Sequence, residues 1–191
     1  MPEESGSDGA GADAPSAAAR DDLAGVVDLF GWLTRAELSR ALSELAFKRR
    51  AEVDDDAIAA AIDVAVAEYA LVPAPPAALA EGGDAPTDVV DPDAGLDADE
   101  VALAVGPAAF PSLPTDAEDL PHILDVPERG VDREALSKAV LARLSEDAIA
   151  AIGEGDADRL EVLAAVTYDV EAWAPVDAGE IRERIVAELD A

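Results

Sequence analysis

The sequence predicts a mainly α-helical protein of two small helical units, joined by an irregular Pro- and Asp-rich connector with room for a short β-hairpin. Apolar residues recur at helical spacing in residues 21–80 and again in 131–191. Between these stretches, residues 71–130 hold ten of the thirteen prolines. The chain therefore divides into a disordered tail, an N-terminal helical unit, an acidic Pro-rich connector and a C-terminal helical unit, at 1–20, 21–80, 81–130 and 131–191.

Three helices are predicted in the N-terminal unit. The first carries one apolar stripe and closes at Gly31. The second starts with Thr34 and Glu37, three residues apart, which is the spacing of a capping box. The third begins after the cap residue Asp54 and ends before Pro73, because proline cannot continue a helix. The predicted bounds are 21–30, 34–50 and 54–69.

The connector has weaker signals. Val101–Phe110 alternates loosely, so we expect a short strand or hairpin there that could pair with Leu71 and Val72. Residues 81–98 are expected to form a mobile acidic loop. Asp116–Leu124 is expected to form one or two helical turns.

Four helices are predicted in the C-terminal unit. The first follows the cap Asp132, and Ser145 restarts a short second helix that ends at Gly153. The last is capped by Asp177 and turns Ile185 and Leu189 inward. The third helix spans about 156–173.

The two units share a local pattern. Thr34–Leu42 aligns with Asp132–Val140 in its cap, charged and apolar positions. One explanation is that Ala-rich amphipathic helices all look alike. The other is a duplicated two-helix unit, because one such unit buries too little apolar surface alone.

The charge is strongly negative. Lys plus Arg number 13 and Asp plus Glu number 43, which gives a net charge of −30. Such a chain repels itself at low ionic strength, whereas a screening length of about 3 Å at molar salt removes most of that penalty. The composition therefore indicates a protein that works in concentrated salt. Disorder is the alternative that high charge allows, but half of the residues are apolar and fall in helical periods.

The stretch VDLFGWLTRAELSRALSELAF, residues Val27–Phe47, resembles small acidic haloarchaeal proteins of unknown function. The similarity extends over the chain after the first twenty residues. It implies a halophilic protein, and it implies no activity and no site residue.

Several classes of protein are disfavoured by composition. There is no Cys for a disulfide, a thiolate nucleophile or a Cys-ligated metal, and no segment has the length of a membrane span or the pattern of a signal peptide. We therefore expect a cytoplasmic protein. The single histidine, His122, has no nucleophile beside it, and the acidic clusters at Asp54–Asp56 and 91–100 do not match a calcium loop. The sequence thus predicts no enzyme, no cofactor and no metal.

The cations gather in two places, and this gives the candidate binding residues. The favoured interpretation is a surface that binds an unknown protein partner. The simpler interpretation is that these cations only balance charge within their own helices. A helix-turn-helix-like regulator bound to nucleic acid is the alternative, although its third helix would be acidic. Trp32, Phe47, Tyr69 and Trp173 are expected to be core or half-buried anchors. The candidate partner-binding residues are Arg35, Arg40, Lys48, Arg49, Arg50, Arg129, Arg133, Lys138 and Arg143.

Overall fold

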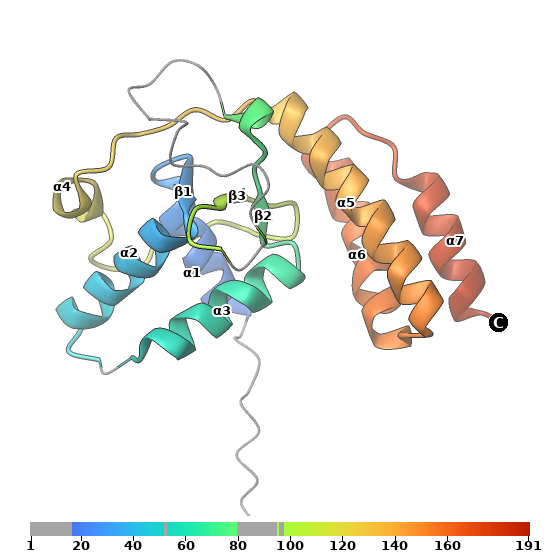
Figure 1. The fold of residues 1–191 in the computed structure, drawn as a ribbon, viewed down its shortest axis with the longest axis horizontal. Helices are drawn as coiled ribbons and strands as arrows, with labels where there is room; N and C mark the ends of the chain where they lie inside the picture. Colours follow the sequence, from blue (N-terminus) through green and yellow to red (C-terminus); the bar gives the residue numbers. More distant parts are fainter. Residues whose placement is uncertain (1–16, 52, 80–94, 96–97) are drawn as a thin grey trace, which may run out of the picture.

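The computed structural model describes residues 17–51, 53–79, 95 and 98–191. It confirms a mainly helical protein with one small sheet. Figure 1 shows two lobes side by side: the N-lobe, described residues 17–124, and the C-lobe, residues 133–191. The first sixteen residues of the predicted tail and most of the predicted loop 81–98 lie outside the described residues.

The N-lobe contains four α-helices, a 3₁₀ turn and three strands. The first helix begins four residues before the predicted start, so the prediction that residues 17–20 belong to a disordered tail is wrong. The third helix ends at Ala67, and Tyr69 lies beyond it. The bounds are α1 Ala17–Asp28, β1 Trp32–Thr34, α2 Arg35–Lys48, α3 Asp55–Ala67, β2 Leu71–Pro73, η1 Pro76–Ala78, β3 Ala102–Val105 and α4 Leu120–Leu124.

The helix caps predicted for α2 and α3 are both present. The Thr34 hydroxyl accepts a hydrogen bond from the Glu37 amide at 3.2 Å, and the Glu37 carboxylate accepts one from the Thr34 amide at 2.8 Å. Asp54 accepts from the Ala57 amide at 2.7 Å. Each side chain satisfies an amide that has no partner within its own helix, which fixes where α2 and α3 begin.

The three strands form an antiparallel sheet in the order β1-β3-β2. The predicted pairing of the connector with Leu71 and Val72 is confirmed, because Leu71 lies opposite Val105 and Val72 opposite Ala104. The sequence analysis did not predict β1, whose Trp32 also lies opposite Ala104. The central strand therefore comes from the segment that was expected to be a connector.

The sheet is buried on both faces. Trp32, Val72 and Ala104 belong to a core shared with the C-lobe helices. Leu33 and Leu103 belong to a second core with α1, α2 and α3. Strands covered on both sides read as continuous apolar runs without alternation. This is why β1 gave no strand pattern in the sequence.

From α1 to β3 the N-lobe has the order helix, strand, two helices, strand, 3₁₀ turn, strand, and its first strand pairs with its last. The short helix α4 follows the sheet.

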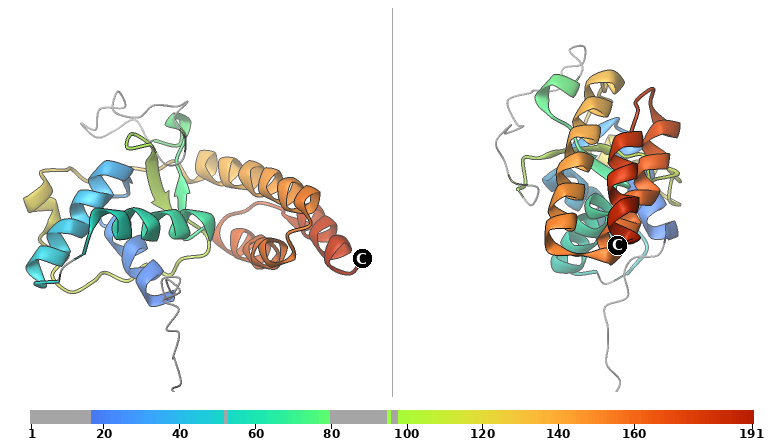
Figure 2. Two further views of the ribbon diagram at one scale, coloured as in Figure 1. Left: turned by 60° about the horizontal axis from the view of Figure 1, so that its bottom comes forward. Right: turned by 90° about the vertical axis from the view of Figure 1, so that its right-hand side faces the viewer.

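The C-lobe consists of α5 Arg133–Glu154, α6 Ala157–Trp173 and α7 Gly179–Leu189, which lie side by side (Figure 2). The prediction of a new helix at Ser145 is wrong, because α5 continues without a break to Gly155, which takes a left-handed conformation. The N-cap residue of the last helix is Ala178 and not the predicted Asp177. Leu189 is exposed at 37 %, so only Ile185 of the expected pair turns inward.

Two further points of the sequence analysis concern both lobes. In the described ranges no helix combines the length and the apolar character that crossing a bilayer requires. The duplication of α2 and α3 as α5 and α6 stays a prediction.

Two helical glycines provide a matched test of the packing. A Cβ at Gly25 in α1 would lie 2.0 Å from the backbone oxygen of Ser112, whereas a Cβ at Gly153 in α5 meets nothing within 4 Å. We expect Gly25→Ala to lower the free energy of unfolding by on the order of 3 kcal/mol, since backbone must move. Gly153→Ala should raise it by about 0.5–1 kcal/mol. Denaturant unfolding in molar salt measures both, and equal midpoints for the two variants would contradict this packing.

Candidate protein-binding site

Arg35 and Arg129, two of the nine candidate cations, lie inside the molecule, with side chains 7 % and 4 % exposed. Arg35 begins α2 and reaches α3, where its Nη2 donates to Asp63 Oδ1 at 2.6 Å and to the Ala59 carbonyl at 3.2 Å. It therefore links two helices and is not part of an exposed surface.

Arg129 ties the segment between the lobes to α2. Its guanidinium donates to both oxygens of Glu37 at 2.6 and 2.7 Å and lies 4.1 Å from the centre of the Trp32 ring. The backbone also approaches closely here, because the Arg129 carbonyl would be 1.8 Å from a Cβ on Gly31. Burial alone would raise the pKa of Glu37, but the hydrogen bonds from Arg129 and Thr34 outweigh it and lower the pKa.

Arg143 lies at the contact between the lobes together with Arg159, which the sequence analysis missed. Arg143 Nη2 donates to the Val66 carbonyl at 2.9 Å, and Arg159 Nη1 donates to the Ala67 carbonyl at 2.6 Å. These are carbonyls of the last turn of α3, which has no cation of its own there. Two guanidinium groups from the C-lobe therefore complement the negative end of the α3 dipole.

Tyr69 is held between these two arginines. The Arg143 and Arg159 guanidinium carbons lie 4.4 and 5.9 Å from its ring centre, and its hydroxyl donates to Asp147 at 2.9 Å. Its φ of 62° is left-handed, and the Ala70 amide donates to the Ala65 carbonyl, which completes a Schellman motif usually closed by glycine. Burial raises the pKa of Tyr69 well above its usual value.

The three cations at the end of α2 differ in their surroundings. Lys48 donates to Asp119 at 3.3 Å, and Arg49 donates to the Thr115 carbonyl at 2.7 Å, so both hold residues of the connector. Arg50 is exposed, and its side chain bonds to none of the residues that the structure describes. Phe47 beside it is 81 % exposed, so the prediction that this ring is a core anchor is wrong.

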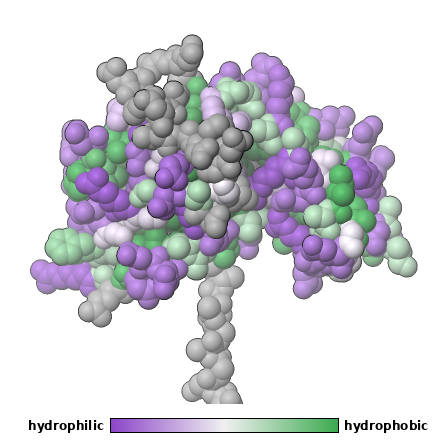
Figure 3. All heavy atoms as spheres, viewed as in Figure 1, coloured by the Kyte–Doolittle hydropathy of each residue, from purple (hydrophilic) through white to green (hydrophobic). Residues whose placement is uncertain are grey.

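The three remaining candidates do not extend this group. Arg133 lies 5.2 Å from the Trp173 ring centre, and Lys138 pairs with Glu134 one helical turn away. Arg40 is exposed, and Glu37, three residues before it in α2, binds Arg129. The nine cations thus form no single surface. On the face shown in Figure 3, hydrophilic residues cover much of both lobes between apolar patches.

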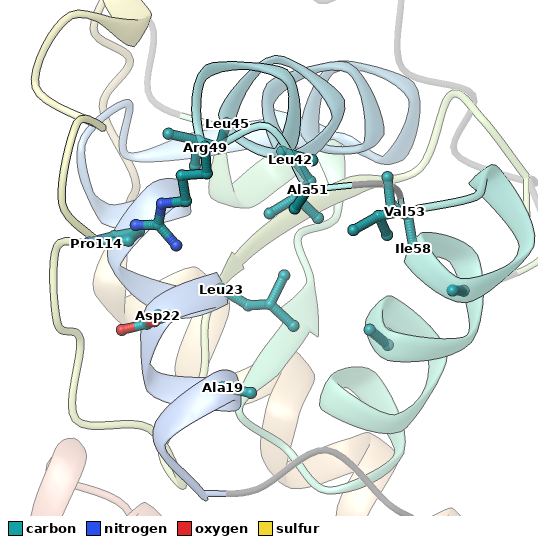
Figure 4. A pocket seen from close by; sticks show the side chains of 13 residues that line it. Ala19, Asp22, Leu23, Leu42, Leu45, Arg49, Ala51, Val53, Ile58 and Pro114 are labelled. Carbon is teal, nitrogen blue, oxygen red and sulfur yellow. The ribbon is translucent and has the colours of Figure 1, made fainter. Parts of the chain in front are cut away.

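An apolar groove of about 280 Å³ opens between α1, α2 and α3. Leu23, Leu42, Val53 and Ile58 surround it, and Arg49 lies at its edge (Figure 4). A second hollow next to it, of about 550 Å³, is lined by Phe47, Lys48, Arg50 and Ala51. Ala51 lines both. We name the groove together with Phe47, Arg50, Ala51 and Val53 the α2-end surface.

The residues considered as catalytic or metal-binding candidates do not lie together in one site. His122 is exposed in α4. Asp54 caps α3, and Asp55 and Asp56 are exposed in its first turn. Within the described part of the chain, no three His, Asp or Glu side chains converge as a metal site would require. The acidic residues Asp91, Asp93 and Asp97 lie outside the described residues.

A family model described as a family of unknown function, DUF7109, matches residues 21–190. The chain belongs to this family. The match covers both lobes, from the second turn of α1 to the end of α7. The searches of curated proteins and of solved structures returned no match.

The lowered pKa of Glu37 predicts a specific pH dependence. A carboxylate whose pKa is depressed by folding contributes stability above its unfolded pKa of about 4.3, and that stability is lost as the pH falls through the folded value. We expect Glu37→Gln to lower the free energy of unfolding by about 1–3 kcal/mol at pH 7. The difference between the wild type and the variant should shrink as the pH falls below about 4. Denaturant unfolding at pH 7, 5 and 3.5 measures it, and a constant difference would show that the ion pair is not responsible.

Proposed function

We propose that this protein is a non-enzymatic interaction module that binds a protein partner through the α2-end surface. The observation that carries the proposal is Phe47, which is 81 % exposed beside an apolar groove. Exposed aromatic and arginine side chains around a hollow are typical of the residues that dominate protein interfaces. The groove of about 280 Å³ is lined mostly by aliphatic side chains, so it suits an apolar side chain of a protein partner.

The backbone of Arg50 supports this proposal. Its φ is 55°, and the Ala51 amide donates to the Ala46 carbonyl, so Arg50 is in the position of a Schellman motif that favours glycine. A non-glycine residue there costs about 1 kcal/mol. Tyr69 has the same conformation, but Asp147 and two arginines hold it. No comparable contact from the described residues holds Arg50, which suits a side chain retained for an external partner.

Binding to nucleic acid is the second candidate. The order of the N-lobe elements favours it, because a winged helix-turn-helix domain has the same order, with α3 in the place of the recognition helix. Charge argues against it. The exposed residues of α3 include Asp55, Asp56 and Asp63, and this helix contains no Lys, Arg, Asn or Gln to reach a phosphate or a base edge. A wild-type protein that binds duplex DNA with an affinity that falls steeply with salt would favour this candidate instead.

We also propose that the protein acts in the cytoplasm of a halophile. The support is the net charge of −30, which compact folding tolerates best where counterions are dense. The interaction is therefore best tested at molar salt.

Phe47→Asp tests the proposed surface, and Phe110→Asp is its control. Phe110 is 80 % exposed but lines neither hollow. We expect proteins captured from the source cells in molar salt by the immobilised wild type to be retained by Phe110→Asp. Phe47→Asp should lose them at least tenfold, since loss of a central aromatic anchor costs about 2 kcal/mol or more. Equal capture by both variants would contradict the proposal.

A further inference from the structure

We infer that the α2-end surface binds a second copy of this chain, with Phe47 of each copy in the groove of the other. This inference rests on the proposed function, because it names the partner of the same surface. A two-fold interface uses one patch on both subunits, so the patch must contain both the projecting group and the hollow that receives it.

Shape supports this inference. Phe47 projects from the end of α2, and the groove lies beside the same helix end, with Ala51 bordering both hollows. A two-fold axis near Ala51 would therefore bring two Phe47 rings to two grooves at once. The groove walls are mostly aliphatic, which matches the ring in polarity.

Charge supports it as well. Arg50 lies on one side of the α2-end surface, at the end of α2. Asp55 and Asp56 flank its other side, at the start of α3. A two-fold rotation exchanges these sides, so the guanidinium of each copy faces the carboxylates of the other. Asp22 and Arg49 also line the groove, one of each sign. An acidic partner would use Arg50 but would be repelled by Asp55 and Asp56.

The inference gives the salt dependence a definite sign. Two chains of −30 repel each other over long distances, and salt screens this repulsion without weakening the buried apolar contact. This gain outweighs the screening of the few pairs between Arg50 and the carboxylates of the other copy. The dimer should therefore become tighter as salt is raised. An acidic protein or a nucleic acid bound through Arg50 would instead be released by salt.

Sedimentation equilibrium of the full chain is the test, over micromolar to submillimolar protein and from about 3 M KCl down to the lowest concentration at which circular dichroism shows the chain folded. The wild type is expected to reach twice the 19.6 kDa chain mass, with a dissociation constant that falls as salt rises. Phe47→Asp should raise this constant at least tenfold, and Phe110→Asp should leave it unchanged. Ala57→Leu, which fills the groove from α3, should also weaken the dimer while Phe47 is intact.

Arg50→Gly separates binding from folding. Glycine suits the left-handed position, so this variant should melt no lower than the wild type and yet dimerise more weakly. A wild type that stays monomeric throughout, or a dimer insensitive to Phe47, would overturn the inference. The proposed function would survive that result if capture of another protein still required Phe47. It would fail too if capture were equal in Phe47→Asp and Phe110→Asp.

Discussion

The last turn of α3 is held by two guanidinium groups that come from the other lobe. Arg143 and Arg159 bind the carbonyls of Val66 and Ala67, and the Tyr69 ring lies between them with its hydroxyl on Asp147. Arg143 adds a second donor to the Val66 carbonyl, which also accepts from the Tyr69 amide, and Arg159 donates to the exposed Ala67 carbonyl, so both lobes contribute to the pairing of this helix end. The contact orients α5 and α6 against the sheet, whose outer face shares a core with them.

Arginines also connect separate elements elsewhere in the chain. Arg35 fixes α2 on α3, Arg129 fixes the segment between the lobes on Glu37, and Arg182 binds Thr167 and Glu171 between α6 and α7. A chain with only thirteen cations among forty-three acids thus places several of them between elements. Acids are left to dominate the outside, where Arg50 lies beside the exposed Phe47. A planar guanidinium suits these positions because it can bind two acceptors and stack on a ring at once.

Patterns within one helix were predictable from the sequence, and contacts between elements were not. The caps Thr34 and Asp54 were found because a cap and its amide partner are three residues apart. The strand at Trp32 was missed because residues buried on both faces show no alternation. The role of Arg159 was hidden because its acceptor at Ala67 is 92 residues away. The candidate cations were recognised by local density, which could not tell the buried Arg129 from the exposed Arg50.

The most direct test of this account is the stability of a chain in which both arginines at the α3 end are replaced by methionine. Arg143→Met with Arg159→Met keeps side-chain length but removes the donors to Val66, Ala67 and Asp147. Arg184→Met, at an exposed position of α7, is the control. Unfolding in molar salt should show a loss of about 2–3 kcal/mol for the double variant, since the Ala67 carbonyl loses its arginine donor, and Val66 and Asp147 keep only the Tyr69 amide and hydroxyl. The control should stay within about 0.5 kcal/mol of the wild type. Equal stability of the two variants would contradict the central place given to these arginines.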